Sequence, residues 1–309
     1  MTPKEMNALE SALIGIFDRL ILNAIAKLQP KNGLQEPDYV AALTEYFTAD
    51  LATILNLVFP KYDFTVSGVF CHQKPIVDIH ETKKPELGDI LFVYSETQPD
   101  GSIQYNSLLL QAKITSQPVM RVPSGDLHQL KLYKEWPTFT YYRANFLNGQ
   151  TRNIQPKAIN DGAQYLLIDN NPLTNGLNGI PNTYPMGCAI ANDTLILDKS
   201  LSAELFDFFK FKSGRVFEEN PLSTQDDWTK MIWDLLLMGA YNYNRSNIGM
   251  NNAKRGVYCS NKAGFDQTAV GASLNQYFGA FEDNNLNDYP RDNDGMGISV
   301  VVIERGIKK

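Results

Sequence analysis

Apolar residues recur every three or four positions in two early segments, the spacing typical of helices with one buried face. The first segment spans residues 6–28 and is followed by a Pro- and Gly-containing stretch that ends a helix. In the second, Pro37 occupies a favourable first-turn position and apolar residues fall on one face up to Pro60. The sequence therefore predicts two consecutive amphipathic helices.

The hydrophobic pattern changes after Pro60. "YDFTVSGVF" (62–70) is rich in β-forming residues, and "PIVDIH" (75–80) extends or follows it. "DILFVYS" (89–95) and "NSLLLQAKIT" (106–115) are nearly continuous apolar runs, as expected for strands covered on both faces. "QPDG" supplies a turn between these two runs.

A further helix is predicted over residues 124–136, with Ser124 or Asp126 as its N-cap, and a strand over 163–169. The order helix, three strands, helix, strand indicates an α/β fold with a central sheet flanked by helices. Residues 171–309 are less regular, with predicted helices, an Asn/Gly-rich stretch and a final strand. This C-terminal extension either forms a separate unit or completes the same sheet.

Composition sets broad limits on function. The chain has 309 residues, of which 43% are hydrophobic, enough for a substantial core. A formal net charge of -6 argues against binding nucleic acid through bulk electrostatics, although a local basic groove remains compatible with it. Three widely spaced cysteines suggest neither disulfides nor a cysteine zinc site, so a reducing, cytoplasmic location is expected. Charges within residues 12–28 favour an amphipathic helix over a signal or membrane segment.

Three polar residues interrupt the apolar strand pair at one end. Gln111 and Lys113 are two positions apart and share a face, from which Ala112 points away, and Asp89 opens the neighbouring strand. Same-face residues on adjacent strands lie about 5 Å apart. The Asp89 carboxylate, the Gln111 side-chain oxygen and the Ala112 carbonyl are the oxygen donors that Mg²⁺ or Mn²⁺ prefers. Lys113 would then lie beside an attacking water and a phosphate.

The pair "GDI" (88–90) and "QAK" (111–113) resembles the PD-(D/E)XK nuclease superfamily, and its Gln-x-Lys form is similar to the Mrr-like restriction endonuclease branch. The resemblance covers about residues 37–170, preceded by the N-terminal helix within residues 1–36. It implies an αβββαβ restriction-endonuclease-like core with metal ligation by Asp89, ligation or positioning by Gln111, and catalysis by Lys113. The implied activity is Mg²⁺-dependent cleavage of DNA, in prokaryotic defence or restriction.

The sequence departs from the family pattern at two positions. Gly88 replaces the Pro of the superfamily's name, and Gln111 replaces an acid, so a further carboxylate is needed to hold the metal. The family often supplies that carboxylate from the first core helix, where Glu45, Asp50 and Glu36 are the candidates. On the helix after the Lys113 strand, Gln129 could support the site and His128 could assist proton transfer.

Substrate contact is expected from three basic residues near the strand pair, namely Arg121, Lys131 and Lys134. The acidic net charge suggests that a partner protein or oligomer delivers or gates the DNA. Two other functions stay open: a catalytically weak or inactive nuclease-fold subunit for binding or assembly, and an RNA nuclease. A purely structural explanation also stays open: Asp89 would be a cap at the start of its strand, and Gln111 and Lys113 would lie at an exposed strand end.

Overall fold

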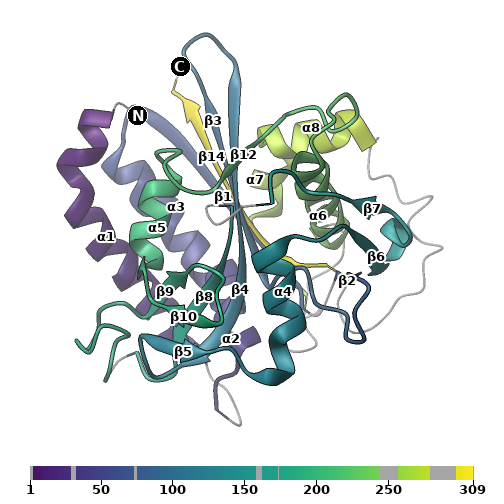
Figure 1. Ribbon diagram of the computed structural model, residues 1–309. Helices are drawn as coiled ribbons and strands as arrows, with labels where there is room; N and C mark the ends of the chain where they lie inside the picture. The colour runs from purple at the N-terminus through teal and green to yellow at the C-terminus, as the bar shows by residue number, and fades with distance from the viewer. Residues whose placement is uncertain are drawn as a thin grey trace.

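The computed structural model has a mixed β-sheet with helices on both faces (Figure 1). The structure describes most of the chain. The described ranges are residues 3–28, 33–72, 75–157, 162–172, 174–243, 257–278 and 297–308. The α/β class predicted from the sequence is confirmed.

In the described part of the chain, eight strands run across the central sheet in one hydrogen-bonded order, and a ninth pairs with one of them. In order, they are β11 (Lys199–Ser200), β9 (Met186–Ala189), β8 (Ala163–Asp169), β4 (Ile103–Thr115), β3 (Ile90–Thr97), β14 (Ser299–Ile307), β1 (Tyr62–Phe70) and β13 (Tyr258–Ser260), with β12 (Arg215–Phe217) on β4. β3 and β4 form the predicted antiparallel pair, and β8 runs parallel to β4.

The last strand of the chain lies inside this sheet. β14 pairs antiparallel with β1 from Tyr62↔Ile307 to Val69↔Val300, and parallel with β3 from Ser299↔Ile90. β14 therefore separates two strands that are neighbours in sequence order within the predicted core. The residues after position 171 thus contribute a strand to the middle of the sheet.

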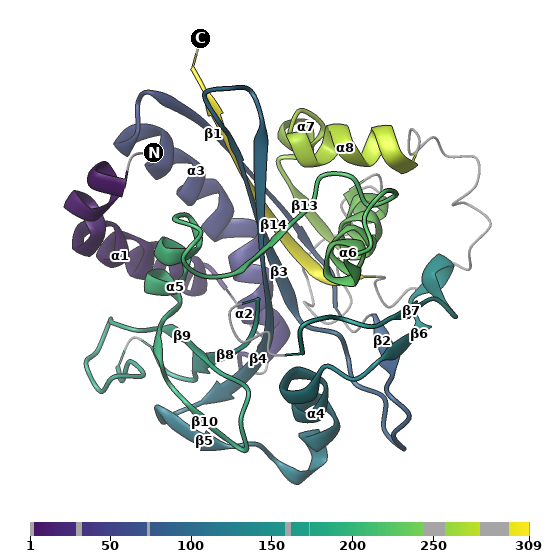
Figure 2. The same ribbon diagram turned by 45° about the horizontal axis from the view of Figure 1, so that its top comes forward.

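Two helical layers cover the sheet (Figure 2). One layer contains α1 (Pro3–Ala26), α2 (Glu36–Ala42), the π-helical turn η1 (Leu43–Phe47), α3 (Thr48–Val58) and α5 (Leu201–Phe208). The other contains α4 (Leu127–Glu135), α6 (Asp227–Tyr243), α7 (Lys262–Asp266) and α8 (Ala269–Phe278). Alternate residues of β3 supply the two cores: Ile90 packs with the first layer and Leu91 with the second.

Short elements outside the central sheet complete the fold. They are the pair β5 (Val119–Arg121) and β10 (Thr194–Ile196), the sheet of β2 (Ile76–Asp78), β6 (Phe139–Arg143) and β7 (Thr151–Arg152), and the 3₁₀ turns η2 (Ser124–Asp126) and η3 (Asn145–Leu147). Within the described ranges, the structure has no helix long and apolar enough to cross a membrane.

Candidate active site

Asp89 and Gln111 meet where β3 begins and β4 continues past it. The backbone N–H of Asp89 donates to Leu110 O (2.9 Å), which holds Asp89 in register with the strand. The Gln111 side-chain amide donates to Asp89 Oδ2, and the backbone N–H of Ala112 donates to the same oxygen (2.7 Å). The strand pair therefore brings together the residues that its sequence pattern predicted to converge.

Lys113 follows on the same face of β4 and has an acidic partner from another element. Its Nζ lies 2.9 Å from Oδ2 of Asp126, at the start of α4, and its side chain is only 12% exposed. Burial lowers the pKa of Lys113, but the hydrogen bond to Asp126 and the charges of Glu36, Asp126 and Asp89 outweigh it and raise the pKa overall. Lys113 is therefore held as a cation.

Asp126 differs from its expected role. It occupies the N-cap position of α4, as the sequence predicted, but its side chain makes no capping hydrogen bond. The carboxylate turns to Lys113 instead. Sequence reasoning missed this pairing because Asp at a helix start is ordinarily explained by capping alone.

Two glutamates add negative charge beside Asp89. Glu36, at the first position of α2, accepts a hydrogen bond from the backbone N–H of Ile114 on β4 (3.2 Å). Glu86 is fixed by a backbone bridge to Ile76 of β2. Glu36 was one of three carboxylates proposed from the sequence, whereas Glu86 was missed, although its place three residues before Asp89 was a usable signal.

Burial and neighbouring negative charge raise the pKa of Asp89 and of Glu86. Burial raises the pKa of Asp89 well above its usual range, and the charges of Glu86 and Glu36 raise it further. The hydrogen bond from Ala112 N–H and the charge of Lys113 lower this pKa but do not cancel the rise. The pKa of Glu86 is raised mainly by burial, which the Lys113 charge opposes and the Glu36 charge reinforces. A bound cation would relieve this repulsion.

Gly88 is explained by its surroundings. A Cβ at this position would lie 2.8 Å from Leu109 Cδ1 and 2.9 Å from Oη of Tyr133, which itself donates to Leu87 O (3.0 Å). There is little space here for a larger residue, which accounts physically for a glycine at this position.

The other two carboxylates proposed from the first core helix lie in different surroundings. Asp50 forms an ion pair with Lys27 (3.1 Å). Glu45 lies on η1. Burial raises its pKa, and the lowering effects of a hydrogen bond with Tyr46 and of the Lys27 charge are smaller. Neither is a hydrogen-bond partner of Asp89 or Gln111 among the described residues, and Glu36 is the member of the three that reaches β4.

The residues proposed on and near α4 are divided between core and surface. Gln129 is buried on the helix that supplies Asp126. On the surface, Lys131 pairs with Glu81, and Lys134 pairs with Asp193 (3.0 Å). His128 is half-buried, and burial lowers its pKa. Arg121 is exposed on β5.

The donor set suits a hard divalent cation in its chemistry. Gln111 Oε1 is buried and has no hydrogen-bond partner among the described residues, and the same holds for Oη of Tyr165, its register partner on β8. Orphaned buried oxygen atoms beside repelling carboxylates are a favourable setting for Mg²⁺ or Mn²⁺. Within the described ranges, however, no three His, Cys, Asp or Glu side chains are gathered into a ready-made metal group. Metal binding would therefore require side chains such as Gln111 to rearrange.

The arrangement combines repelling carboxylates, an amide oxygen and a fixed ammonium group at one edge of the sheet. Such a set can position a cation and a water and can stabilise negative charge on a phosphate. Comparisons with protein-family models, curated proteins and solved structures give no match to this chain.

Proposed function

We propose that the protein is a metal-dependent endonuclease that hydrolyses DNA phosphodiester bonds. The observation that carries this proposal is the contact between Asp89 and Gln111, with Lys113 on the same face and Glu36 and Glu86 beside them. A strand end with a purely structural role has little reason to keep an aspartate whose pKa is raised by burial and by two nearby glutamates.

The order of elements supports a restriction-endonuclease-like core. A helical segment (36–58) is followed by β1, β3, β4, α4 and β8, in the order αβββαβ expected for residues 37–170. Of the other strands between these elements, β2, β6 and β7 form a separate small sheet and β5 pairs with β10. β14, inserted between β1 and β3, is an addition to that core.

The proposed roles follow from position and charge. Asp89, Gln111 and the Ala112 carbonyl would hold Mg²⁺, with Glu36 or Glu86 supplying the missing charge. The ion would supply Lewis acidity toward the phosphate and its attacking water. Lys113, kept protonated and oriented by Asp126, would stabilise the charge that develops on the phosphate. Its raised pKa favours this electrostatic role over that of a general base.

The test is cleavage of supercoiled plasmid in Mg²⁺ or Mn²⁺ by the wild type and by Asp89→Asn and Lys113→Met variants. We expect both variants to lose at least 100-fold in rate, because each removes an interaction with the reacting phosphate or its metal. Lys230→Met is the matched control, since Lys230 also pairs with an aspartate (3.3 Å), on α6. Activity retained in Asp89→Asn and Lys113→Met would refute the site.

The second candidate function is a nuclease-fold subunit that binds or assembles without cleaving. It is favoured by the hydrogen bonds that occupy Asp89 Oδ2 and by the absence of a gathered metal group within the described residues. Folded wild type that cleaves neither DNA nor RNA with either metal would favour this function. Cleavage of RNA alone would assign the same site to an RNA nuclease.

Delivery by a partner is a further part of the proposal. The net charge is -6, and both Lys131 and Lys134 are paired with acids. We therefore expect weak DNA affinity for the isolated chain. Tight and salt-sensitive binding of a 30-base-pair duplex by the isolated protein would contradict this expectation.

A further inference from the structure

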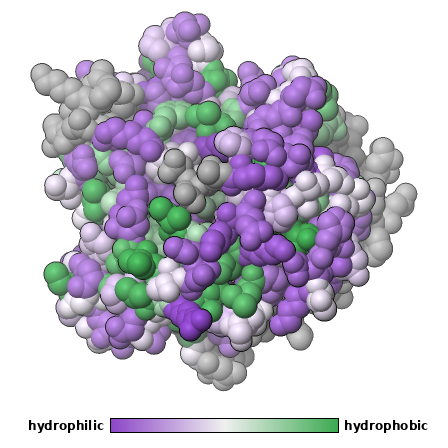
Figure 3. All heavy atoms as spheres, in the orientation of Figure 1, coloured by the Kyte–Doolittle hydropathy of each residue, from purple (hydrophilic) through white to green (hydrophobic). Residues whose placement is uncertain are grey.

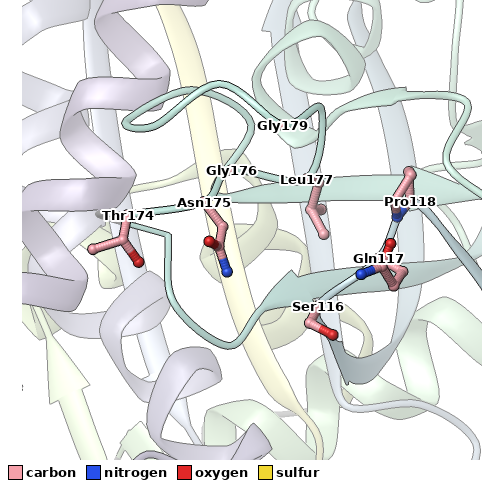
Figure 4. Close-up of a pocket in the computed structure, with 8 residues that line it drawn as sticks. All are labelled: Ser116, Gln117, Pro118, Thr174, Asn175, Gly176, Leu177 and Gly179. Atoms are coloured by element: carbon pink, nitrogen blue, oxygen red, sulfur yellow. The ribbon is translucent and has the colours of Figure 1, made fainter.

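A pocket of about 300 Å³ opens directly beyond the strand that carries Lys113 (Figure 4). One wall is the segment 116–118 that follows β4, and the other is a loop after β8. The lining residues are Ser116, Gln117, Pro118, Thr174, Asn175, Gly176, Leu177 and Gly179. The two walls begin at the ends of the paired strands β4 and β8. A hydrogen bond from Asn170 N to Thr115 O (3.1 Å) joins these two ends.

The loop wall is held in shape by its own backbone. Gly176 has a φ of 71°, and a Cβ there would lie 2.2 Å from Ile180 O, so the loop closes tightly at this glycine. Leu177 N donates to Tyr184 O (3.1 Å), and Asn175 N donates to Asn171 O (3.0 Å). The pocket therefore has at least one preformed wall.

The chemistry of the lining is neutral and polar, with an apolar part. Gln117 and Asn175 carry carboxamides, and no hydrogen bond joins either amide to another described residue. Pro118 contributes apolar surface, whereas Leu177 is only 1% exposed and adds almost none. In Figure 4 the side chains of Asn175 and Leu177 point from the loop toward the segment that contains Ser116. None of the lining residues is charged, which disfavours a phosphate as the occupant.

The surface next to the pocket is also apolar. Val119, directly after Pro118, is 50% exposed, and its register partner Ile196 on β10 is 60% exposed. Figure 3 shows apolar side chains gathered over β5 and β10 at the lower left of this face. Apolar surface beside free carboxamides suits a flat heterocycle with hydrogen-bonding edges.

We infer that this pocket binds one nucleobase of the substrate, with adenine preferred. Asn and Gln amides pair with N6 and N7 of adenine, which accounts for the preference. Ser116 is three residues from Lys113, or about 10 Å along an extended chain, which is about three base steps of DNA. The inference rests on the proposed function, since it makes the pocket a specificity site beside the cleaved bond.

The test measures binding of 2′-deoxyadenosine 5′-monophosphate and of 2-deoxyribose 5-phosphate to the full chain by saturation-transfer NMR. We expect the nucleotide to bind at least tenfold more tightly than the sugar phosphate, and Asn175→Ala and Gln117→Ala each to weaken nucleotide binding at least fivefold. Gln104→Ala, an exposed amide at the other end of β4, is the control and should bind as the wild type does.

The outcomes separate the pocket from the catalytic site. Equal binding of the two probes, no nucleotide binding by the wild type, or unchanged binding by Asn175→Ala would overturn the base pocket. Lys113→Met should bind the nucleotide normally while losing cleavage. If Lys113→Met still cleaves DNA, the proposed catalytic site fails whatever the nucleotide-binding result.

Discussion

At the scale of single residues, the candidate site centres on Asp89, a carboxylate placed where burial and nearby negative charge oppose its ionisation. It is partly buried, receives two hydrogen bonds on one oxygen, and lies in the negative field of Glu86 and Glu36. Its pKa is raised, so holding this carboxylate ionised at neutral pH costs folding free energy. Residues that a fold retains against its own stability are candidates for function.

Replacing Asp89 with Asn should therefore stabilise the metal-free protein. We expect a gain of about 1 kcal/mol in unfolding free energy at pH 7 in EDTA, because the amide keeps an acceptor for Ala112 N–H but removes the repelled charge. Added Mn²⁺ should stabilise the wild type and leave the variant unchanged. Urea unfolding of both proteins, with and without metal, measures these effects; a loss of stability in EDTA would contradict them.

Asp126→Asn should change the pH dependence of any activity that needs protonated Lys113. Asp126 raises the pKa of Lys113, so its neutral replacement lowers that pKa and the ammonium is lost at a lower pH. The alkaline limb of the rate profile should move to lower pH. Asp193→Asn, which removes the partner of Lys134, should leave the limb in place; an identical shift in both variants would reject the assignment.

At the scale of elements, the π-helical turn η1 rests directly on β1. A Cβ at Gly68 would lie 2.1 Å from the backbone oxygen of Thr44, so the contact is possible only for glycine. Thr44 Oγ1 in turn donates to Ala41 O (3.0 Å). Backbone atoms cannot move aside as a flexible side chain can, so this contact sets the distance between the helical layer and the sheet.

Gly68→Ala should accordingly destabilise the protein by about 2–3 kcal/mol through overpacking. Gly15→Ala provides the control: Gly15 is exposed within α1, and a Cβ there meets nothing within 4 Å. Because alanine favours helix, that variant should gain about 0.5–1 kcal/mol. Chemical denaturation of the two variants should move in opposite directions, and a neutral Gly68→Ala would show that the layers can separate.

A buried carboxylate joins α6 to the small sheet of β2, β6 and β7. Asp234 accepts hydrogen bonds from Tyr141 Oη (3.0 Å) and from Arg152 Nε (2.9 Å) and Nη2 (3.1 Å to Oδ1). Burial raises the pKa of Asp234 to about 6, against the lowering effects of Arg152 and Tyr141. The folded state therefore binds a proton here more tightly than the unfolded chain does.

Because of the raised pKa of Asp234, the free energy of unfolding should decrease as the pH rises. The proton's stabilising contribution is complete below the unfolded pKa of 3.8 and is lost as pH rises through about 6. Relative to Asp234→Asn, the wild type should lose about 3 kcal/mol of unfolding free energy between pH 3.5 and pH 7. Denaturation curves of both proteins across that range provide the measurement; parallel pH dependences would contradict it.

At the scale of the whole molecule, β14 makes the C-terminal residues part of the central sheet. It pairs along nearly its full length with β1 on one side and β3 on the other, and residues 300–303 are buried. Without β14, the β1 edge and the β3 edge would both be exposed as unpaired strands. The sheet formed by residues 62–169 therefore depends on a strand that follows it in sequence by more than 120 residues.

Deleting residues 297–309 should prevent folding, although these residues follow the other long strands of the sheet by more than 120 positions. We expect the truncated chain to lack a cooperative unfolding transition and to aggregate, because two long strand edges lose their partner. Circular dichroism melts and size-exclusion chromatography measure this outcome. A shorter deletion of residues 308–309, beyond the strand, is the control; a folded chain lacking 297–309 would contradict the role of β14.

The sequence by itself determined the local structure and the central polar cluster. Apolar spacing of three or four predicted the helices and continuous apolar runs predicted β3 and β4, since these patterns depend on local geometry. The two-residue step from Gln111 to Lys113, opposite Asp89, also placed these side chains on one face, and the structure brings them there.

Only the tertiary structure decided which charges surround that cluster and which strand divides the core. Glu36 and Asp126 lie at the starts of α2 and α4, where acids are common, and Glu86 lies at a backbone bridge to β2. The local sequence around these three acids does not by itself establish that they face Asp89 or Lys113. Their convergence depends on which distant segments pack together, as does the insertion of β14. Periodicity along a chain reports which face of an element is buried, but not which element will cover it.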